Sequence, residues 1–490
     1  MKRSYVQNVR ILAASEVLLR LRGLILIPIL TKHFGAANYG IWSQVTIVVS
    51  LLSPLLALGL DSAVMRFLPG RPTADIAIGF WSVVMYLAAA SAVAAGVLWF
   101  ASGPIAGAFF GGADNAGYVS ICGLSLVVSV LLNQCRNLFR TIGSAKGFAG
   151  VSLVQGASAV TIGALVAGLH DTVWTLVSAT VAADAALLMV ALVVILRRIG
   201  VAAPDWRRLR AYVRYGLPLV PGGYAVWALN SSDRLFIAHY LTMADIGVYS
   251  VVYSLGYMLI SAIANPLWVM YPAQAAEAYN RGDLSALRSL FGGVSRAMLG
   301  LLIPAVVGLS VLAKPVMLLM TSRAFLRGAP LIPIVASAYL LFMLSSFFDV
   351  NLGLVGKQMW CSINVTIGMV VNVALNFYAV PRFGIAGAAV TTLIGFTVHC
   401  ALSAVMGTRA LPMPFDLKFV WKVLVASALM GASMLMIPVG GDAWLIGPAV
   451  LVGVVAYATA ILALRAVTRR ELRVVLSVMH VRFAPAGVAD

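Results

Sequence analysis

Apolar runs of about 20 residues recur along the whole chain, and short polar segments separate them. A helix of that length crosses a hydrocarbon layer of about 30 Å. The runs lack the alternation of polar and apolar positions that a membrane barrel would need. The pattern therefore predicts an all-α, polytopic membrane protein with about fourteen transmembrane helices. We place them near residues 9–32, 40–61, 77–100, 117–138, 147–168, 173–196, 213–238, 246–272, 294–313, 329–349, 358–379, 384–407, 418–438 and 443–465.

The composition favours the same class of protein. Hydrophobic residues occupy 62% of the 490 positions and charged residues 10%, whereas a soluble domain has roughly 25% charged residues. The formal net charge is +18, but the cations lie in short loops and form no basic arm. We therefore expect contacts with membrane lipids and no nucleic-acid partner. The four cysteines have no metal or redox spacing, and we expect no metal and no cofactor.

The basic residues also predict an orientation. With an even number of spans both termini lie on one side, and that side receives roughly 26 Lys and Arg residues against roughly 6 on the other. The positive-inside rule then places both termini in the cytoplasm. The expected location is the cell inner membrane, as a multi-pass protein.

An internal repeat predicts how the helices are grouped. TKHFGAANYGIWS (31–43) aligns without a gap on AHYLTMADIGVYS (238–250), so that Gly40 matches Gly247 and Ser43 matches Ser250. An even number of predicted spans separates the copies, which relates the halves by a pseudo-twofold along the membrane normal. We predict two six-helix lobes plus two C-terminal helices. The boundaries are 1–200 for the N-terminal lobe, 201–410 for the C-terminal lobe, 411–465 for the last two helices and 466–490 for a cytoplasmic amphipathic tail.

Several segments resemble the multidrug/oligosaccharidyl-lipid/polysaccharide exporter superfamily, particularly its Wzx-type polysaccharide flippases. They are LTKHFGAANYGIWSQ, LGLDSAVMRFLP, RYGLPLVPGG, SDRLFIAHYLTMADIGVYSVVYSL, LWVMYPAQAAEAYNRGD and VPRFGIAGAAVTTLIG. They follow the family's order over nearly the whole chain. The resemblance implies a bundle with a central cavity that opens alternately to each side. It also implies a lipid-linked oligosaccharide substrate on polyprenyl pyrophosphate, flipped to the periplasmic leaflet for O-antigen, capsule or exopolysaccharide export.

Charged residues inside the spans are candidate binding groups, because placing each one in lipid costs at least ~2.5 kcal/mol. Arg20 and Arg22 lie near the middle of the first span, and Glu16 is one helical turn before Arg20. The distance from Arg20 to the FGA turn resembles the lipid II flippase branch, in which an arginine at this place lines the cavity. Arg20 is thus a predicted pyrophosphate contact, and a structural pair with Glu16 is the alternative. The predicted substrate-binding set is Arg20, Arg22, Arg66, Asp233 and Arg234.

Several of these residues have a second interpretation. Arg66 lies at the cytoplasmic end of the second span and would equally suit a lipid headgroup. Asp233 and Arg234 are adjacent and would also suit an ion pair at the membrane interface. His239 and His399 are lone histidines, for which a structural role is favoured over a proton relay.

The sequence favours a transporter over an enzyme. It contains no GxSxG, HExxH or Walker motif, so transport would be driven by an ion gradient, the membrane potential or substrate consumption. The alternatives are a lipid II flippase, a multidrug antiporter, whose relatives usually stop at twelve spans, and a membrane polymerase, which would carry a large periplasmic loop. H+ and Na+ both remain candidate coupling ions, and we expect a monomer.

Overall fold

A computed structural model describes residues 2–439 and 443–466 of the chain. For residues 2–22, 269 and 270 it describes the backbone alone. The side chains of Glu16, Arg20 and Arg22 therefore lie outside the described part, as does the predicted tail beyond Ala466.

The described residues form helices joined by short turns, and no strand occurs among them. The α-helices are α1 (Lys2–Ala57), α2 (Leu60–Phe67), α3 (Thr73–Phe100), α4 (Ser102–Phe109), α5 (Ala116–Thr141), α6 (Ala145–Gly168), α7 (Val173–Ile199), α8 (Trp206–Gly216), α9 (Val220–Ser231), α10 (Asp233–Tyr240), α11 (Met243–Asn280), α12 (Leu284–Val311), α13 (Ala313–Met320), α14 (Ile332–Leu354), α15 (Gln358–Ala410), α16 (Leu417–Leu435) and α17 (Ile446–Ala463). The short 3-10 helices are η1 (Ala113–Asn115), η2 (Leu217–Leu219), η3 (Arg323–Leu331) and η4 (Ala443–Leu445). The predicted all-α class is confirmed.

Eleven of the described helical segments are long and apolar enough to cross a membrane. The helices α1 and α15 each join two predicted spans across a glycine with left-handed backbone, Gly35 at φ 73° and Gly384 at φ 60°. Glycine adopts that conformation without the penalty that a Cβ brings. The predicted span 213–238 is divided among α8, η2, α9 and α10 and is not one of the eleven. The chain is a polytopic membrane protein, and the count of fourteen spans stays a prediction.

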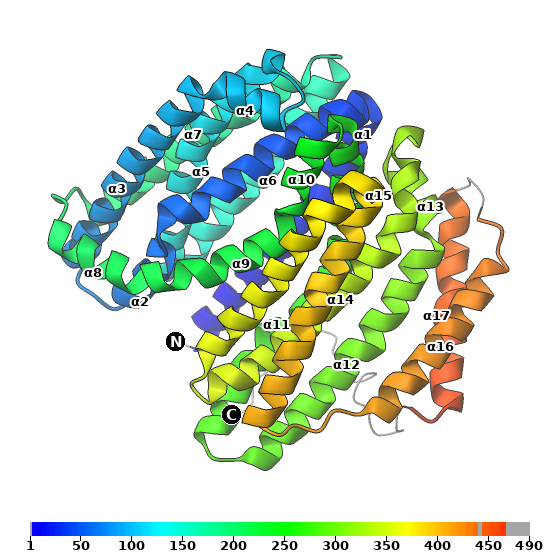
Figure 1. The fold of residues 1–490 in the computed structure, drawn as a ribbon. Coiled ribbons are helices and arrows are strands. Elements are labelled where there is room, and N and C mark those ends of the chain that lie inside the picture. The colour runs from blue at the N-terminus through cyan, green and yellow to red at the C-terminus, as the bar shows by residue number, and fades with distance from the viewer. Residues whose placement is uncertain (1, 440–442, 467–490) are drawn as a thin grey trace. The chain divides into compact units, whose positions relative to one another are not determined.

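The chain folds as two compact units. The first comprises Met1–Met258 and Met317–Gly407, and the second comprises Leu259–Val316 and Thr408–Asp490. In the first unit, α1 packs against α5 and α6, and α5 packs in turn against α3 and α7 (Figure 1). This bundle surrounds the candidate site. The two units do not test the predicted lobes 1–200 and 201–410, which remain a prediction.

In the second unit α12, α16 and α17 pack together. Their apolar core contains Leu312, Met430, Met434 and Ala449. The Tyr457 hydroxyl of α17 donates a 2.6 Å hydrogen bond to the Gly300 carbonyl of α12. This hydrogen bond satisfies the tyrosine's polar end where α17 packs against α12.

The two copies of the repeat meet inside the first unit. A Cβ on Gly40 would overlap the carbonyl oxygen of Met243, and a Cβ on Gly247 would overlap that of Ala36. Met243 is the repeat equivalent of Ala36, so the close approach is reciprocal. The hydroxyls of Ser43 and Ser250, also equivalent, are 2.6 Å apart and buried. Reciprocal contacts of this kind are what a twofold axis produces, so α1 and α11 are related by a local twofold at this point.

Two other motif segments also meet through glycine. Gly59, at φ 72°, lies against the Gly216 backbone, and a Cβ on either residue would overlap the other segment. The LGLDSAVMRFLP and RYGLPLVPGG segments are thereby brought together next to α8.

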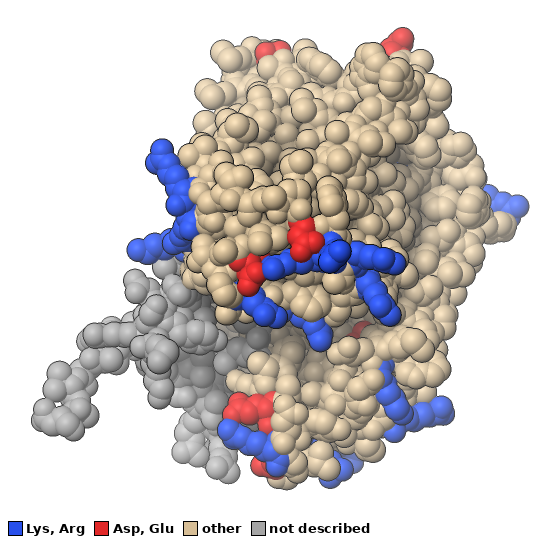
Figure 2. Space-filling view, turned by 90° about the vertical axis from the view of Figure 1, so that its left-hand side faces the viewer, with Lys and Arg blue, Asp and Glu red and all other residues tan. Residues whose placement is uncertain are grey.

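The helix α8 carries a row of arginines. Asp205 directly precedes the helix and caps it, because its carboxylate accepts a 2.8 Å hydrogen bond from the backbone N–H of Arg207. Arg208 pairs with Asp75 of α3 at 2.6 Å, and the ring of Tyr212 stacks on Phe67 of α2. Figure 2 looks onto this side and shows Lys and Arg gathered in a band beside a broad uncharged surface. A basic band next to an apolar surface is typical of a membrane–water interface.

Candidate functional site

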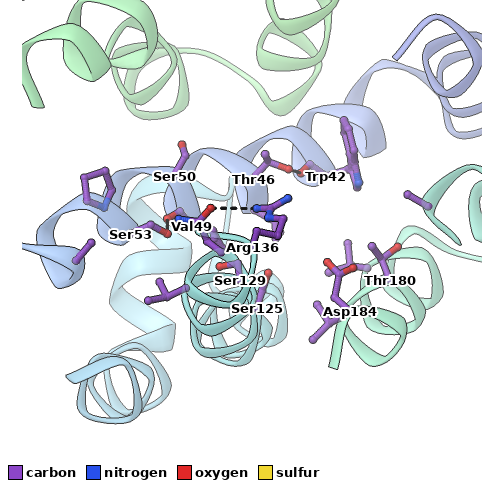
Figure 3. Close-up of a pocket in the computed structure, with 18 of the residues that line it drawn as sticks. Trp42, Thr46, Val49, Ser50, Ser53, Ser125, Ser129, Arg136, Thr180 and Asp184 are labelled. Carbon is purple, nitrogen blue, oxygen red and sulfur yellow. Dashed lines mark hydrogen bonds between the residues drawn. The ribbon is translucent and has the colours of Figure 1, made fainter. Parts of the chain in front are cut away.

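The bundle in the first unit encloses a cavity of about 480 Å³. Its lining comes from α1, α2, α3, α5, α6 and α7. Figure 3 shows Ser50 and Ser53 of α1, Arg136 of α5 and Asp184 of α7 around the same space. Ligand pockets usually measure roughly 300–1,000 Å³, so the cavity has room for a small polar ligand or part of a larger one.

A hydrogen-bonded network of polar side chains runs along the cavity across four helices. The carboxylate of Asp61 (α2) accepts from the amide of Asn133 (α5) at 3.3 Å, and the Asn133 oxygen accepts from Arg136 at 3.3 Å. Arg136 also donates to Gln155 (α6) at 2.9 Å, and the Gln155 amide donates to Asp184 (α7) at 3.1 Å. Ionisable residues held within transmembrane helices mark binding or transport pathways.

Short hydroxyl side chains and one aromatic ring complete the lining. Ser125, Ser129 and Thr180 face the space from α5 and α7. Trp42 contributes an indole ring, and Ser50 accepts a 3.1 Å hydrogen bond from the indole N–H of Trp227 on α9. Donors and acceptors of several kinds therefore surround the cavity.

The charge of this network is informative. Among the described side chains it contains one cation, Arg136, and two carboxylates, Asp61 and Asp184. All three are half-buried. This part of the site suits a neutral ligand rich in hydroxyl groups better than an anionic ligand, since the two carboxylates would repel an anion at short range.

The predicted Arg66 lies outside the cavity. It is exposed at the end of α2, where its guanidinium donates to the Tyr215 hydroxyl at 3.4 Å and sits over that ring at 4.7 Å. Its predicted role in substrate binding stays a prediction.

Asp233 and Arg234 form part of a second polar cluster, which is buried. The Asp233 carboxylate accepts from the hydroxyls of Tyr249 and Thr392, the latter at 3.2 Å. The Arg234 guanidinium donates to the Asn230 carbonyl at 2.9 Å and lies 3.9 Å from the centre of the Tyr253 ring. The side chains are 1% and 7% exposed and form an ion pair, with Arg234 Nη1 3.5 Å from Asp233 Oδ1; the position of this pair at the membrane interface stays a prediction. Neither residue lines the cavity.

None of the network residues belongs to the predicted substrate-binding set. Asp184 and Gln155 each stand inside an otherwise apolar run, which is the signal of an intramembrane polar residue. This signal marks each residue separately and does not show that the two side chains are hydrogen-bonded to each other.

One family of known proteins matches the chain. A family described as "Polysaccharide biosynthesis protein" matches residues 29–330, which is more than half of the chain. The chain belongs to this family. The match covers α1 from Ile29 onward and every helix that lines the cavity.

Solved structures of other membrane proteins share the fold of this chain. A structure titled "Lipid II flippase MurJ, inward closed conformation" superposes with a TM-score of 0.76 at 12% identity, covering 92% of this chain and 97% of the other. An inward-facing multidrug resistance MATE transporter of the MOP superfamily superposes with a TM-score of 0.62 at 16% identity, covering 80% and 93%. These identities show a shared fold. Together with the family match, this shared fold confirms the predicted membership of the exporter superfamily.

A curated relative matches over a shorter stretch. The lipid II flippase MurJ of Bacillus subtilis (strain 168) is 26% identical over 181 residues, which is 35% of this chain. The match spans about a third, 31%, of that protein's length.

Proposed function

We propose that the chain moves an oligosaccharide linked to polyprenyl pyrophosphate from the cytoplasmic to the periplasmic leaflet of the inner membrane. The product would feed the export of an O-antigen, capsule or exopolysaccharide. The observation that carries the proposal is the polar network from Asp61 to Asp184 inside apolar helices, in a member of a polysaccharide biosynthesis family.

The chemistry of the lining supports a sugar ligand. Each sugar hydroxyl both donates and accepts hydrogen bonds, and the lining offers carboxylates, amides, hydroxyls and a guanidinium that match both roles. The indole face of Trp42 offers an apolar surface to a sugar ring. A cavity of about 480 Å³ would hold only part of an oligosaccharide at one time.

The pyrophosphate needs cations beyond this network. Arg22 precedes the lining residue Leu26 by four positions, so the two fall on one face of the continuous helix α1. Arg20 falls on a different face. We propose that Arg22 and Arg20 both contact the pyrophosphate, with Glu16 holding Arg20 when the site is empty.

Lipid II is the second candidate substrate. The similarity to MurJ in fold and in part of the sequence favours it. Both candidates carry sugars on a polyprenyl pyrophosphate, so the network and the cations suit either one. The two candidate substrates differ in the glycan that the lipid carries.

A deletion strain distinguishes the two candidates. We expect cells that lack the protein to accumulate a polyprenyl pyrophosphate oligosaccharide, to lose a surface polysaccharide and to remain viable. Mass spectrometry of extracted lipid intermediates measures this. Accumulation of lipid II with loss of viability would instead assign the second substrate.

The proposed orientation gives another prediction. Single cysteines at Asp114 and Arg210, both exposed, are placed in a protein whose four native cysteines are replaced. An impermeant maleimide added to intact spheroplasts should label Asp114→Cys and leave Arg210→Cys unlabelled until the membrane is permeabilised. The reverse labelling pattern would place the termini and the arginine band of α8 in the periplasm.

A further inference from the structure

A carboxylate and an imidazole lie side by side in the first unit, away from the cavity. His399, in the second half of α15, places Nε2 3.4 Å from Oδ2 of Asp349 on α14. The His399 side chain is 3% exposed and that of Asp349 is 21% exposed. Glycines allow this packing, since a Cβ on Gly368 would press on His399 and a Cβ on Gly407 would press on the Phe348 backbone.

The hydrogen bonds of Ser345 favour one tautomer of His399. Ser345 Oγ lies 3.2 Å from His399 Nδ1 and 2.8 Å from the Phe342 carbonyl oxygen, which can only accept a hydrogen. With the serine hydrogen on that carbonyl, the serine oxygen accepts from Nδ1, which favours a hydrogen on Nδ1. In the neutral imidazole Nε2 then has only a lone pair, and it faces a carboxylate oxygen. The two atoms attract each other only when a proton is bound between them.

The surroundings leave this pair without another charge partner. Among the described residues no Lys or Arg pairs with Asp349, and the cations of this segment, Lys357, Arg382 and Arg409, are exposed. Besides His399, the thiols of Cys361 and Cys400 interact electrostatically with the carboxylate. From α11, Tyr257 packs on Tyr339 of α14.

Two polar atoms of the pair itself, Asp349 Oδ1 and His399 Nε2, have no hydrogen-bond partner among the described residues. Buried polar atoms are nearly always hydrogen-bonded, so these two atoms would suit a water molecule or a bound proton.

We propose that Asp349 and His399 together form a binding site for one transported proton. With one proton bound, the pair is neutral overall and compatible with burial. When that proton leaves, a net negative charge remains in a region where ion solvation is poor, which favours a conformation that admits water. Binding and release of the proton would therefore bias the protein between its two states. The role as a coupling site rests on the proposed function, whereas proton binding itself does not.

The first test follows the proton directly. His33, His170, His239 and His480 are replaced by Gln, so that His399 is the only histidine of the full-length protein. The ¹⁵N signals of labelled His399 are then recorded from about pH 5 to about pH 8, the range in which histidine charge commonly changes. We expect Nδ1 to stay protonated while Nε2 loses its proton with rising pH, and Asp349→Asn to alter that transition. A spectrum that is unchanged over this range and unaffected by Asp349→Asn would overturn the site.

The second test measures coupling in vesicles loaded with a lipid-linked oligosaccharide. For one proton per cycle, a gradient of about one pH unit should shift the steady-state leaflet ratio up to about tenfold. Asp349→Asn and His399→Gln should keep translocation without a gradient and lose this shift, whereas the exposed control His239→Gln should keep both. Equal slowing with and without a gradient would mean a structural role and overturn the coupling. If the wild type moves no oligosaccharide lipid, the proposed function fails and the ¹⁵N measurement still decides the proton site.

Discussion

Gly40→Ala and Gly247→Ala are each expected to abolish transport and to destabilise the folded protein. A methyl group at either position would overlap a backbone carbonyl, that of Met243 or that of Ala36. A backbone carbonyl within a helix cannot rotate away as a flexible side chain can. The helices α1 and α11 would therefore have to move apart. The 2.6 Å contact between Ser43 and Ser250 would be lost with them. Overpacking a closely fitted interface costs about 3 kcal/mol or more in severe cases.

The measurement is the melting temperature of purified protein together with complementation of the deletion strain. Gly150→Ala on α6 is the matched control, because a Cβ there meets nothing within 4 Å. Serine substitutions should fail in the same way as alanine. If the Gly40→Ala protein has wild-type stability and complements fully, then α1 and α11 do not approach each other as closely as described here.

Arg136→Ala is expected to reduce translocation by about 100-fold while the protein still folds. Arg136 donates to Gln155 and to Asn133, and it is the described cation between Asp61 and Asp184. A hydrogen bond to a charged group contributes about 1.5–3 kcal/mol, and its loss would leave two carboxylates next to the sugar. Arg136→Lys should retain part of the activity, because it keeps the charge but not the planar fork of donors.

The control for this prediction lies one turn along the same helix. Arg140 is exposed and packs over the Phe148 ring at 5.7 Å, so Arg140→Ala should transport normally. Arg22→Ala and Arg20→Ala extend the series, and both should lower translocation if α1 supplies the pyrophosphate contacts. An Arg136→Ala protein that transports at the wild-type rate would exclude the network from the substrate path.

The sequence predicted the structure best at positions where a residue type has a single structural role. Apolar runs predicted the helices because a segment in lipid must satisfy its backbone hydrogen bonds internally. The match of Gly40 to Gly247 predicted a repeat, and the structure places these two glycines against each other. Gly35 and Gly384 mark the breaks in α1 and α15, where a left-handed backbone requires glycine.

The sequence was least informative about which polar side chains meet. Asn133 and Asp61 are 72 positions apart, and only the packing of α2 against α5 brings them together. A structural role was favoured for His399 because it is a lone histidine in the sequence, whereas its partner Asp349 lies on another helix. Asp233 and Arg234 were found as a polar patch, but their burial with Tyr249 and Tyr253 depends on α11.

The most direct test of the central claim is translocation by the purified protein. Vesicles are prepared with a fluorescent polyprenyl pyrophosphate oligosaccharide or with fluorescent lipid II, and an impermeant quencher reports the fraction in the outer leaflet over time. We predict that the wild type moves the oligosaccharide lipid faster than lipid II, and that Arg136→Ala moves the oligosaccharide lipid about 100-fold more slowly than the wild type. Movement of lipid II alone, or of neither lipid by the wild type, would contradict the proposed function.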